Sequence, residues 1–152
     1  MTLSIGDKAP DFTLKNQHGE DISLSSFRGK NVVLVFFPFA FSGICTGELC
    51  ELRDNLGEFQ TEDAEILAVS CDHFFSNRAF AERDGYTFSV LSDFWPHGDV
   101  SRAYGTFNEG AGAPNRGTFV IDREGILQWQ VVNGIGEARD LGDYRTALAG
   151  LS

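Results

Sequence analysis

The chain has 152 residues, of which 42 % are hydrophobic and 22 % are charged, and this size and composition predict one globular domain over residues 1–152. Its formal net charge of −10, with no basic stripe to offset it, argues against binding to nucleic acid or to an anionic membrane surface. Small molecules and proteins are the expected partners.

The N-terminal segment and the apolar runs bear on where the protein works. Residues 1–8 lack a basic region followed by an apolar stretch, and the longest apolar run, 32–41, is interrupted by Pro38 and is too short to span a bilayer. We therefore expect a soluble protein of the cytoplasm. The 3 cysteines are too few for a secreted disulfide scaffold, so each is reactive, metal-binding or simply buried.

Strand and helix patterns alternate along the first half of the chain. Residues 12–15 and 22–24 flank a polar turn, which predicts an N-terminal hairpin. The run 32–37 has no polar residue and predicts a central strand buried on both faces. Beyond Cys45, apolar residues recur at helical spacing and predict an amphipathic helix on the sheet; they are Leu49, Leu52, Leu56 and Phe59.

The second half continues this alternation. It predicts strands at 66–69 and 88–91 with a helix at 77–83 between them, and then a hairpin of 117–121 and 126–132 around the turn 122–125. A last helix is expected to begin near Asp140, with one apolar face made of Leu141, Tyr144, Leu148 and Leu151.

The order ββ, β, α, β, α, β, α, ββ, α predicts an α/β domain whose mixed sheet is covered by helices on both faces. A thioredoxin-like fold is the natural candidate. The Cys-x-x-Cys pair of a dithiol oxidoreductase is missing, because Cys50 lies five residues after Cys45.

Cys45 lies where chemistry gathers in such a fold, between the end of a central strand and the start of its helix. The unpaired N–H groups and the positive dipole end of a helix N-terminus stabilise a thiolate, which is the nucleophilic form. A thiol with a pKa of about 8.5 is only about 3 % ionised at pH 7, whereas one with a pKa of about 6 is roughly 90 % ionised. A lone cysteine is more often a small buried side chain, so further residues must support this interpretation.

Those residues are Pro38, Ser42 and the distant Arg116, which together with Cys45 resemble the peroxiredoxin motif Pro-x-x-x-Thr/Ser-x-x-Cys and its arginine. The resemblance covers almost the whole chain, and residues 91–98 are similar to the alkyl hydroperoxide reductase E subgroup. It implies a thiol-dependent peroxidase for hydrogen peroxide and organic hydroperoxides, with no cofactor and no metal. It also implies a homodimer.

The resemblance assigns a role to each residue of the motif. The Cys45 thiolate attacks one peroxide oxygen and becomes a sulfenic acid, while negative charge develops along the S–O–O line. Arg116 holds the thiolate and the peroxide oxygen, the Ser42 hydroxyl contacts the substrate, and Pro38 shapes the loop and shields the sulfur from water. The position of Glu48, one helical turn after Cys45, leads us to expect that it orients Arg116 rather than acts on the substrate.

A second thiol must then reduce the sulfenic acid, and the sequence leaves three alternatives. The alkyl hydroperoxide reductase E subgroup uses an external thiol. The Cys-x4-Cys spacing instead resembles the bacterioferritin comigratory protein branch, in which the second cysteine of the helix reduces the sulfenic acid. That resemblance implies this role for Cys50. In an α-helix these residues have Cα atoms about 8.6 Å apart, and a disulfide tolerates at most about 7 Å. The helix must therefore unwind locally, which Gly47 makes easier. Cys71 is the third alternative, although a packed side chain at a strand end describes it better.

Residues outside the motif bear on the substrate, on metal binding and on the reductant. Phe39 and Phe41 straddle the loop and are expected to favour organic hydroperoxides if they line its mouth, and the resemblance places Trp95 near the site. A zinc site at Cys45, Cys50, Cys71 and His73 lacks suitable spacing. The external thiol that regenerates the enzyme is expected to be a thioredoxin, a mycoredoxin or glutaredoxin-like protein, or a low-molecular-weight thiol. A peroxide sensor or a holdase-like interaction protein remains an alternative of a different class.

Overall fold

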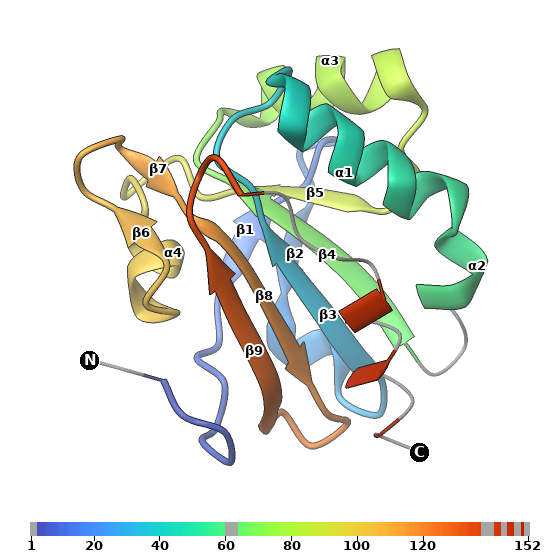
Figure 1. Cartoon of the computed structure of the whole chain (residues 1–152), viewed down its shortest axis with the longest axis vertical. Helices are drawn as coiled ribbons and strands as arrows, with labels where there is room; N and C mark the ends of the chain where they lie inside the picture. Colours follow the sequence, from blue (N-terminus) through green and yellow to red (C-terminus); the bar gives the residue numbers. More distant parts are fainter. Residues whose placement is uncertain (1–2, 60–63, 138–141, 144–145, 148–149, 151–152) are drawn as a thin grey trace.

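The computed structural model describes residues 3–59, 64–137, 142–143, 146–147 and 150, without the side chains of Cys45, Glu58 and Phe59. The strands are β1 Thr13–Lys15, β2 Asp21–Ser23, β3 Asn31–Phe36, β4 Ala64–Ser70, β5 Ser89–Ser92, β6 Phe107–Asn108, β7 Ala113–Pro114, β8 Arg116–Ile121 and β9 Leu127–Asn133 (Figure 1). The helices are the 3-10 helix η1 Leu24–Phe27 and the α-helices α1 Gly43–Asp54, α2 Leu56–Phe59, α3 Phe74–Asp84 and α4 Asp99–Ala103.

Seven of these strands form one mixed sheet in the order β2-β1-β5-β4-β3-β8-β9. β3 lies inside the sheet, parallel to β4 and antiparallel to β8, and all of its residues are buried. This confirms the central strand predicted from the apolar run. The N-terminal hairpin is confirmed by the antiparallel pairing of β1 with β2, and the C-terminal one by the pairing of β8 with β9. Gly125 has a φ of 86° in the turn between β8 and β9, as the turn requires.

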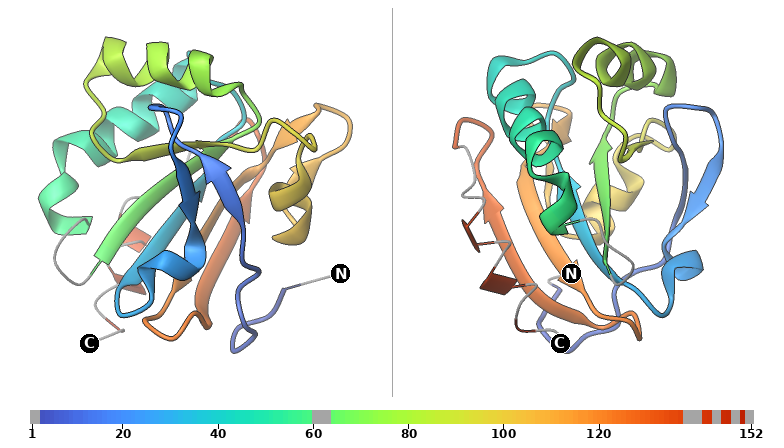
Figure 2. Two further views of the ribbon diagram at one scale, coloured as in Figure 1. Left: turned by 180° about the vertical axis from the view of Figure 1, so that it is seen from behind. Right: turned by 90° about the vertical axis from the view of Figure 1, so that its right-hand side faces the viewer.

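Both faces of the sheet are covered, as the sequence predicts. On one face, Leu49 and Leu52 of α1 and Phe80 of α3 pack against side chains of β3, β4 and β5. Figures 1 and 2 show α1 and α3 over the same end of the sheet. On the other face, Leu24 of η1 and Val100 of α4 pack against the alternate side chains of the same strands. Alternation along each strand therefore divides the core into two layers.

Two helices differ from their predicted bounds for local reasons. The predicted helix through Phe59 ends at Asp54 and resumes as α2, because Asn55 leaves the helical conformation with a φ of −116° and its side-chain amide donates to the Glu51 carbonyl at 2.9 Å. An asparagine side chain that bonds to the backbone competes with the helix in this way. α3 begins at Phe74 rather than at 77, because the His73 ring accepts a hydrogen bond from the Phe75 N–H at 3.1 Å.

The remaining elements concern the ends of the chain and the surface. The small pair β6 and β7 was not predicted. The helix expected from Asp140 falls largely on residues outside the described part of the chain.

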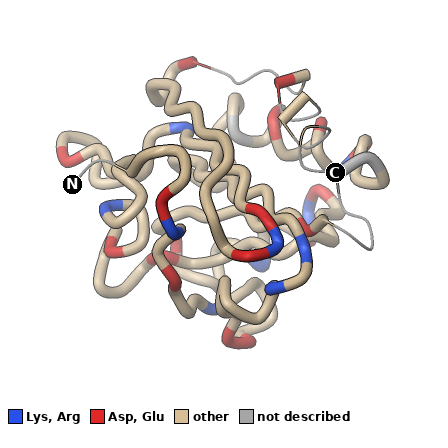
Figure 3. Tube along the Cα trace, turned by 90° about the horizontal axis from the view of Figure 1, so that it is seen from below, with Lys and Arg blue, Asp and Glu red and all other residues tan. Residues whose placement is uncertain are grey.

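None of the described helices has the length and apolar character needed to cross a membrane. Figure 3 shows basic residues scattered among acidic ones, without a separate basic stripe on the described residues in this view.

Candidate active site

The loop between β3 and α1 carries most of the predicted site residues. Pro38 is buried behind the end of β3, and Ser42 is the N-cap residue of α1. The Ala40 N–H donates to Asp72 Oδ2 at 2.9 Å, which ties the loop to the end of β4. Phe41 has a φ of 70°, a left-handed conformation that is uncommon for a bulky residue and is found most often at functional sites.

Cys45 is the third residue of α1, so its backbone lies in the first helical turn, where the sequence places it. Its side chain lies outside the described part of the structure. The dipole and the unbonded N–H groups of a helix start lie within this same turn. The helix therefore provides at Cys45 the electrostatic setting that favours a thiolate.

Ser42 contributes a hydroxyl whose own bonding is incomplete. Its Oγ is buried and has no hydrogen-bond partner among the described residues, and it does not cap the helix. The Ser42 carbonyl still accepts from the Thr46 N–H at 2.9 Å, which fixes the residue at the helix start. A buried hydroxyl left unpaired costs about 1–3 kcal/mol, so this group is available to a ligand that supplies both a donor and an acceptor.

Arg116 and Glu48 form a buried ion pair that connects β8 with α1. Arg116 Nη1 lies 2.6 Å from Glu48 Oε1, and the two side chains are 2 % and 8 % exposed. Arg116 Nε also donates to the Ile135 carbonyl at 2.6 Å. An arginine keeps its charge even when buried, and Glu48 lies one helical turn after Cys45. The sequence suggested that Glu48 orients Arg116, and the structure places the two side chains in direct contact.

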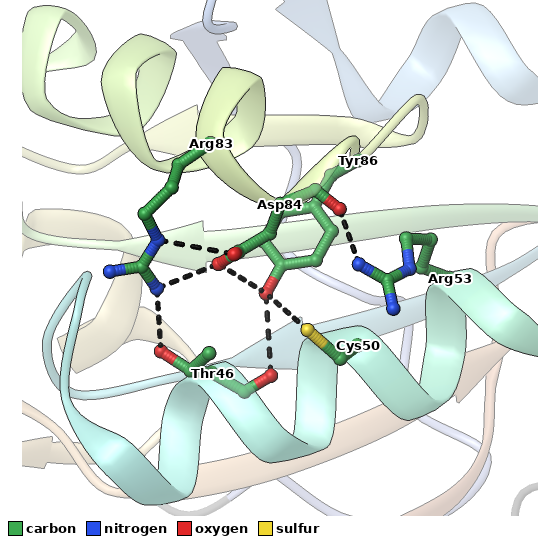
Figure 4. Close-up of polar contacts among 6 residues, drawn as sticks. All are labelled: Thr46, Cys50, Arg53, Arg83, Asp84 and Tyr86. Carbon is green, nitrogen blue, oxygen red and sulfur yellow. Dashed lines mark hydrogen bonds and ion pairs between the residues drawn. The ribbon is translucent and has the colours of Figure 1, made fainter.

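The two other cysteines lie in different surroundings. Cys50 is half-buried on α1, with its Sγ 3.4 Å from the Tyr86 hydroxyl (Figure 4). Cys71 is buried at the end of β4, and its Sγ lies 4.0 Å from Ser101 Oγ. Burial, together with the negative charge of Asp93, raises the pKa of Cys71 to about 12. Cys71 therefore stays protonated at neutral pH and fits a packed side chain at a strand end.

The aromatic residues divide into two groups. Phe39 and Phe41 are 42 % and 45 % exposed on the loop before α1, and the Phe41 ring packs against Phe80 with centroids 5.1 Å apart. Trp95 is 82 % exposed and follows β5, at the same end of the sheet but with β4 between it and β3. Trp95 lines a surface cavity together with Leu14 of β1. Phe39 and Phe41 thus lie on the loop before Cys45, and Trp95 lies beyond β5, which is separated from β3 by β4.

The residues at the end of α3 that bond to α1 were not predicted from the sequence. Arg83, Asp84 and Tyr86, at the end of α3 and just beyond it, bond to Thr46, Cys50 and Arg53 of α1 (Figure 4). No spacing rule connects residues about 35 positions apart, so no signal in the sequence could have found them. Among the described residues, no group of three His, Cys, Asp or Glu side chains is arranged to hold a metal ion.

Comparisons with known proteins point to one family. The sequence profile of the AhpC/TSA family matches residues 5–130. Alkyl hydroperoxide reductase E of Mycobacterium tuberculosis is 52 % identical over 151 residues, which cover 99 % of both chains. Peroxiredoxin Bcp of Bacillus subtilis is 38 % identical over 138 residues, 87 % of this chain and 88 % of the relative.

Solved structures agree with this result. The crystal structure of Enterococcus faecalis AhpC superposes with a TM-score of 0.89 at 26 % identity, and the match covers 99 % of this chain and 93 % of that one. The reduced 2-Cys peroxiredoxin of Plasmodium vivax superposes with a TM-score of 0.83 at 25 % identity, over 93 % and 78 % of the two chains. The mixed sheet and its covering helices are therefore the thioredoxin-like fold that the sequence predicts.

Proposed function

The chain belongs to the AhpC/TSA family, the peroxiredoxins, and from this membership we propose a catalytic cycle centred on Cys45. The protein is a thiol-dependent peroxidase, as are the relatives named alkyl hydroperoxide reductase and peroxiredoxin. The single observation that carries the assignment of the site is the buried pair of Arg116 and Glu48, which fixes a permanent cation beside the first turns of α1.

In the first step, the Cys45 thiolate attacks one oxygen of a hydroperoxide. A sulfur–oxygen bond forms, the O–O bond breaks, and the second oxygen leaves as alkoxide or hydroxide and takes up a proton to give alcohol or water. Cys45 is oxidised to sulfenic acid and the peroxide is reduced. Arg116 stabilises the charge on the thiolate and the peroxide, while the Ser42 hydroxyl supplies a hydrogen bond along the S–O–O line.

Pro38 and Glu48 support these two groups. Pro38 is buried between β3 and the N-cap, has no N–H that needs a partner, and keeps water from the sulfur. Glu48 accepts from Arg116 Nη1 at 2.6 Å and so holds the guanidinium in one orientation.

In the second step, we assign Cys50 as the resolving thiol. Its sulfur attacks the Cys45 sulfur, the S–O bond of the sulfenic acid breaks, and the oxygen leaves as hydroxide that is protonated to water. Cys45 and Cys50 both belong to the continuous helix α1, so their Cα atoms are about 8.6 Å apart by helical geometry. The first turns of α1 must open before the disulfide can form.

Mapping the oxidation products tests this assignment. After one equivalent of peroxide, we expect wild type and Cys71→Ser to lose two hydrogens and to yield a peptide with a Cys45–Cys50 disulfide. Cys50→Ser is expected to gain one oxygen instead, because its sulfenic acid has no partner. Mass spectrometry of the intact and digested proteins distinguishes these products.

A wild-type protein that keeps the sulfenic acid would contradict the role of Cys50. It would point to the cycle with one cysteine, in which an external thiol attacks Cys45 directly. A disulfide to Cys71 would contradict the role as well, and it would require a buried thiol with a raised pKa to become exposed.

The loop aromatics support a preference for organic hydroperoxides. Phe39 is 42 % exposed beside Pro38 and offers apolar contact to a substrate tail. We expect Phe39→Ala to lower the second-order rate constant for a long-chain hydroperoxide about fivefold to thirtyfold, from about 1–2 kcal/mol of lost apolar contact, with little change for hydrogen peroxide. Stopped-flow measurements with both substrates test this, and equal losses for the two would exclude the contact.

The cycle closes when an external thiol donor reduces the disulfide. We propose a thioredoxin, a mycoredoxin or glutaredoxin-like protein, or a low-molecular-weight thiol in this role, and a homodimer in a reducing cytoplasm as the working form. Exposed Phe75 and Phe94 both contact the His73 ring and provide apolar surface for an association of this kind.

A further inference from the structure

The Tyr86 hydroxyl lies between the end of α3 and α1 and contacts both (Figure 4). It lies 3.4 Å from Cys50 Sγ, 3.3 Å from the Thr46 carbonyl oxygen and 3.3 Å from Asp84 Oδ2. A phenol has one O–H to donate and accepts through its oxygen. It therefore accepts from the Cys50 thiol while donating to Thr46 or Asp84, or it donates to a Cys50 thiolate.

The tyrosine is held firmly in this position. Tyr86 is 5 % exposed, its ring stacks on Phe88 with centroids 5.2 Å apart, and it meets Phe80 edge-on at 5.1 Å. Gly85, with a φ of 72°, ends α3 and turns the chain so that Tyr86 enters the core. Burial raises the pKa of Tyr86 far above its usual value, so the hydroxyl keeps its proton at every working pH.

Charged neighbours extend the same contact along α1. Arg83 Nη2 donates to Thr46 Oγ1 at 3.2 Å and to Asp84 Oδ2 at 2.7 Å. Arg53 Nη1 donates to the Asp84 carbonyl at 2.5 Å. The three contacted residues of α1, Thr46, Cys50 and Arg53, follow a spacing of four and then three and so form one stripe of the helix. The end of α3 thus binds the helical segment that must open for the disulfide.

We propose that Tyr86 is a positioning residue for Cys50, whose hydroxyl keeps the resolving sulfur and Thr46 in the wound helix and thereby limits how fast α1 opens. The proposal rests on Cys50 as the resolving thiol. The two contacts of the hydroxyl with α1, at Cys50 Sγ and at the Thr46 carbonyl, depend on the wound geometry, and Cys50 must leave Tyr86 to come within bonding distance of Cys45. The chemistry of the step is unchanged: the Cys50 sulfur still displaces hydroxide from the Cys45 sulfenic acid.

The test is Tyr86→Phe, which removes the hydroxyl and keeps the ring. Oxidation of Cys45 by peroxide should keep its rate constant, whereas disulfide formation should become about three to ten times faster, since one net hydrogen bond of the closed helix is lost. The rates of the wild type and of the variants are compared at one and the same pH. The fraction of Cys45 that excess peroxide oxidises further to sulfinic acid should fall by about the same factor, because the sulfenic acid is consumed sooner.

Tyr104→Phe is the matched control. The Tyr104 hydroxyl is also buried and donates to the Pro10 carbonyl at 2.6 Å, on the opposite face of the sheet from α1. It should lose stability as Tyr86→Phe does, with no change in the rate of disulfide formation. Hydrogen exchange at the amides of residues 46–50 should be faster only in Tyr86→Phe.

A disulfide rate in Tyr86→Phe that equals that of Tyr104→Phe, or is slower than in wild type, would overturn the proposal. This outcome differs from a failure of the proposed cycle. If Cys50 does not resolve, the wild-type protein forms no Cys45–Cys50 disulfide at all, whereas an error about Tyr86 alone leaves that disulfide in place.

Discussion

Cys45→Ser is expected to lower peroxide consumption by at least about four orders of magnitude, the scale seen when an enzyme loses its only nucleophile. A serine hydroxyl at the third position of α1 is not ionised near neutral pH, whereas the helix start favours the thiolate of Cys45. The measurement is steady-state peroxide loss with excess dithiothreitol. Unfolding in urea shows whether the variant remains folded.

Cys71→Ser is the control for the loss of a thiol. Cys71 is buried at the end of β4 and has a raised pKa, so we expect this variant to keep the wild-type rate. A Cys45→Ser protein that still consumes peroxide at a comparable rate would move the chemistry to another residue and would refute the proposed site.

The second large effect is expected for Arg116→Met. Loss of the cation should lower the rate constant for Cys45 oxidation about 10²- to 10³-fold, the usual result of removing one preorganised donor. It also breaks the buried ion pair with Glu48, and the loss of one member of such a pair typically destabilises the fold by about 3–5 kcal/mol. Single-turnover kinetics and urea unfolding measure the two effects separately.

Arg116→Met combined with Glu48→Gln separates catalysis from stability. The second substitution removes the uncompensated charge and keeps the shape of the side chain, so much of the lost stability should return. The oxidation rate should stay low, because the cation remains absent. Recovery of rate and stability together would show that Arg116 acts only through the fold.

The main elements of the fold could be predicted because their signals are local. The run 32–37 contains only apolar residues, which is typical of a strand that is buried on both faces inside a sheet. The strand β3 is indeed fully buried. The bounds of helices were less accurate, because single side chains set them. The Asn55 amide ends α1 by bonding to the backbone, and the His73 ring caps α3, a role that serine, threonine or aspartate fills more often.

The site divides in the same way. Cys45 at a helix start follows from the residues around it, but Arg116 lies 71 positions away and is found only through the family motif. The contact between Arg116 and Glu48 needs the folded positions of β8 and α1. The bonds from Tyr86 to Thr46 and Cys50 have no family motif and no periodicity behind them, so only the structure reveals them.

The proposed role of Cys45 is tested most directly by titration of its thiol in the Cys50→Ser/Cys71→Ser protein, in which Cys45 is the only cysteine. Ultraviolet absorbance of the thiolate is followed against pH, with and without Arg116→Met. We predict a midpoint at about pH 6, which moves upward when the arginine is removed. A midpoint at about 8.5, the value of an ordinary thiol, in both proteins would contradict it.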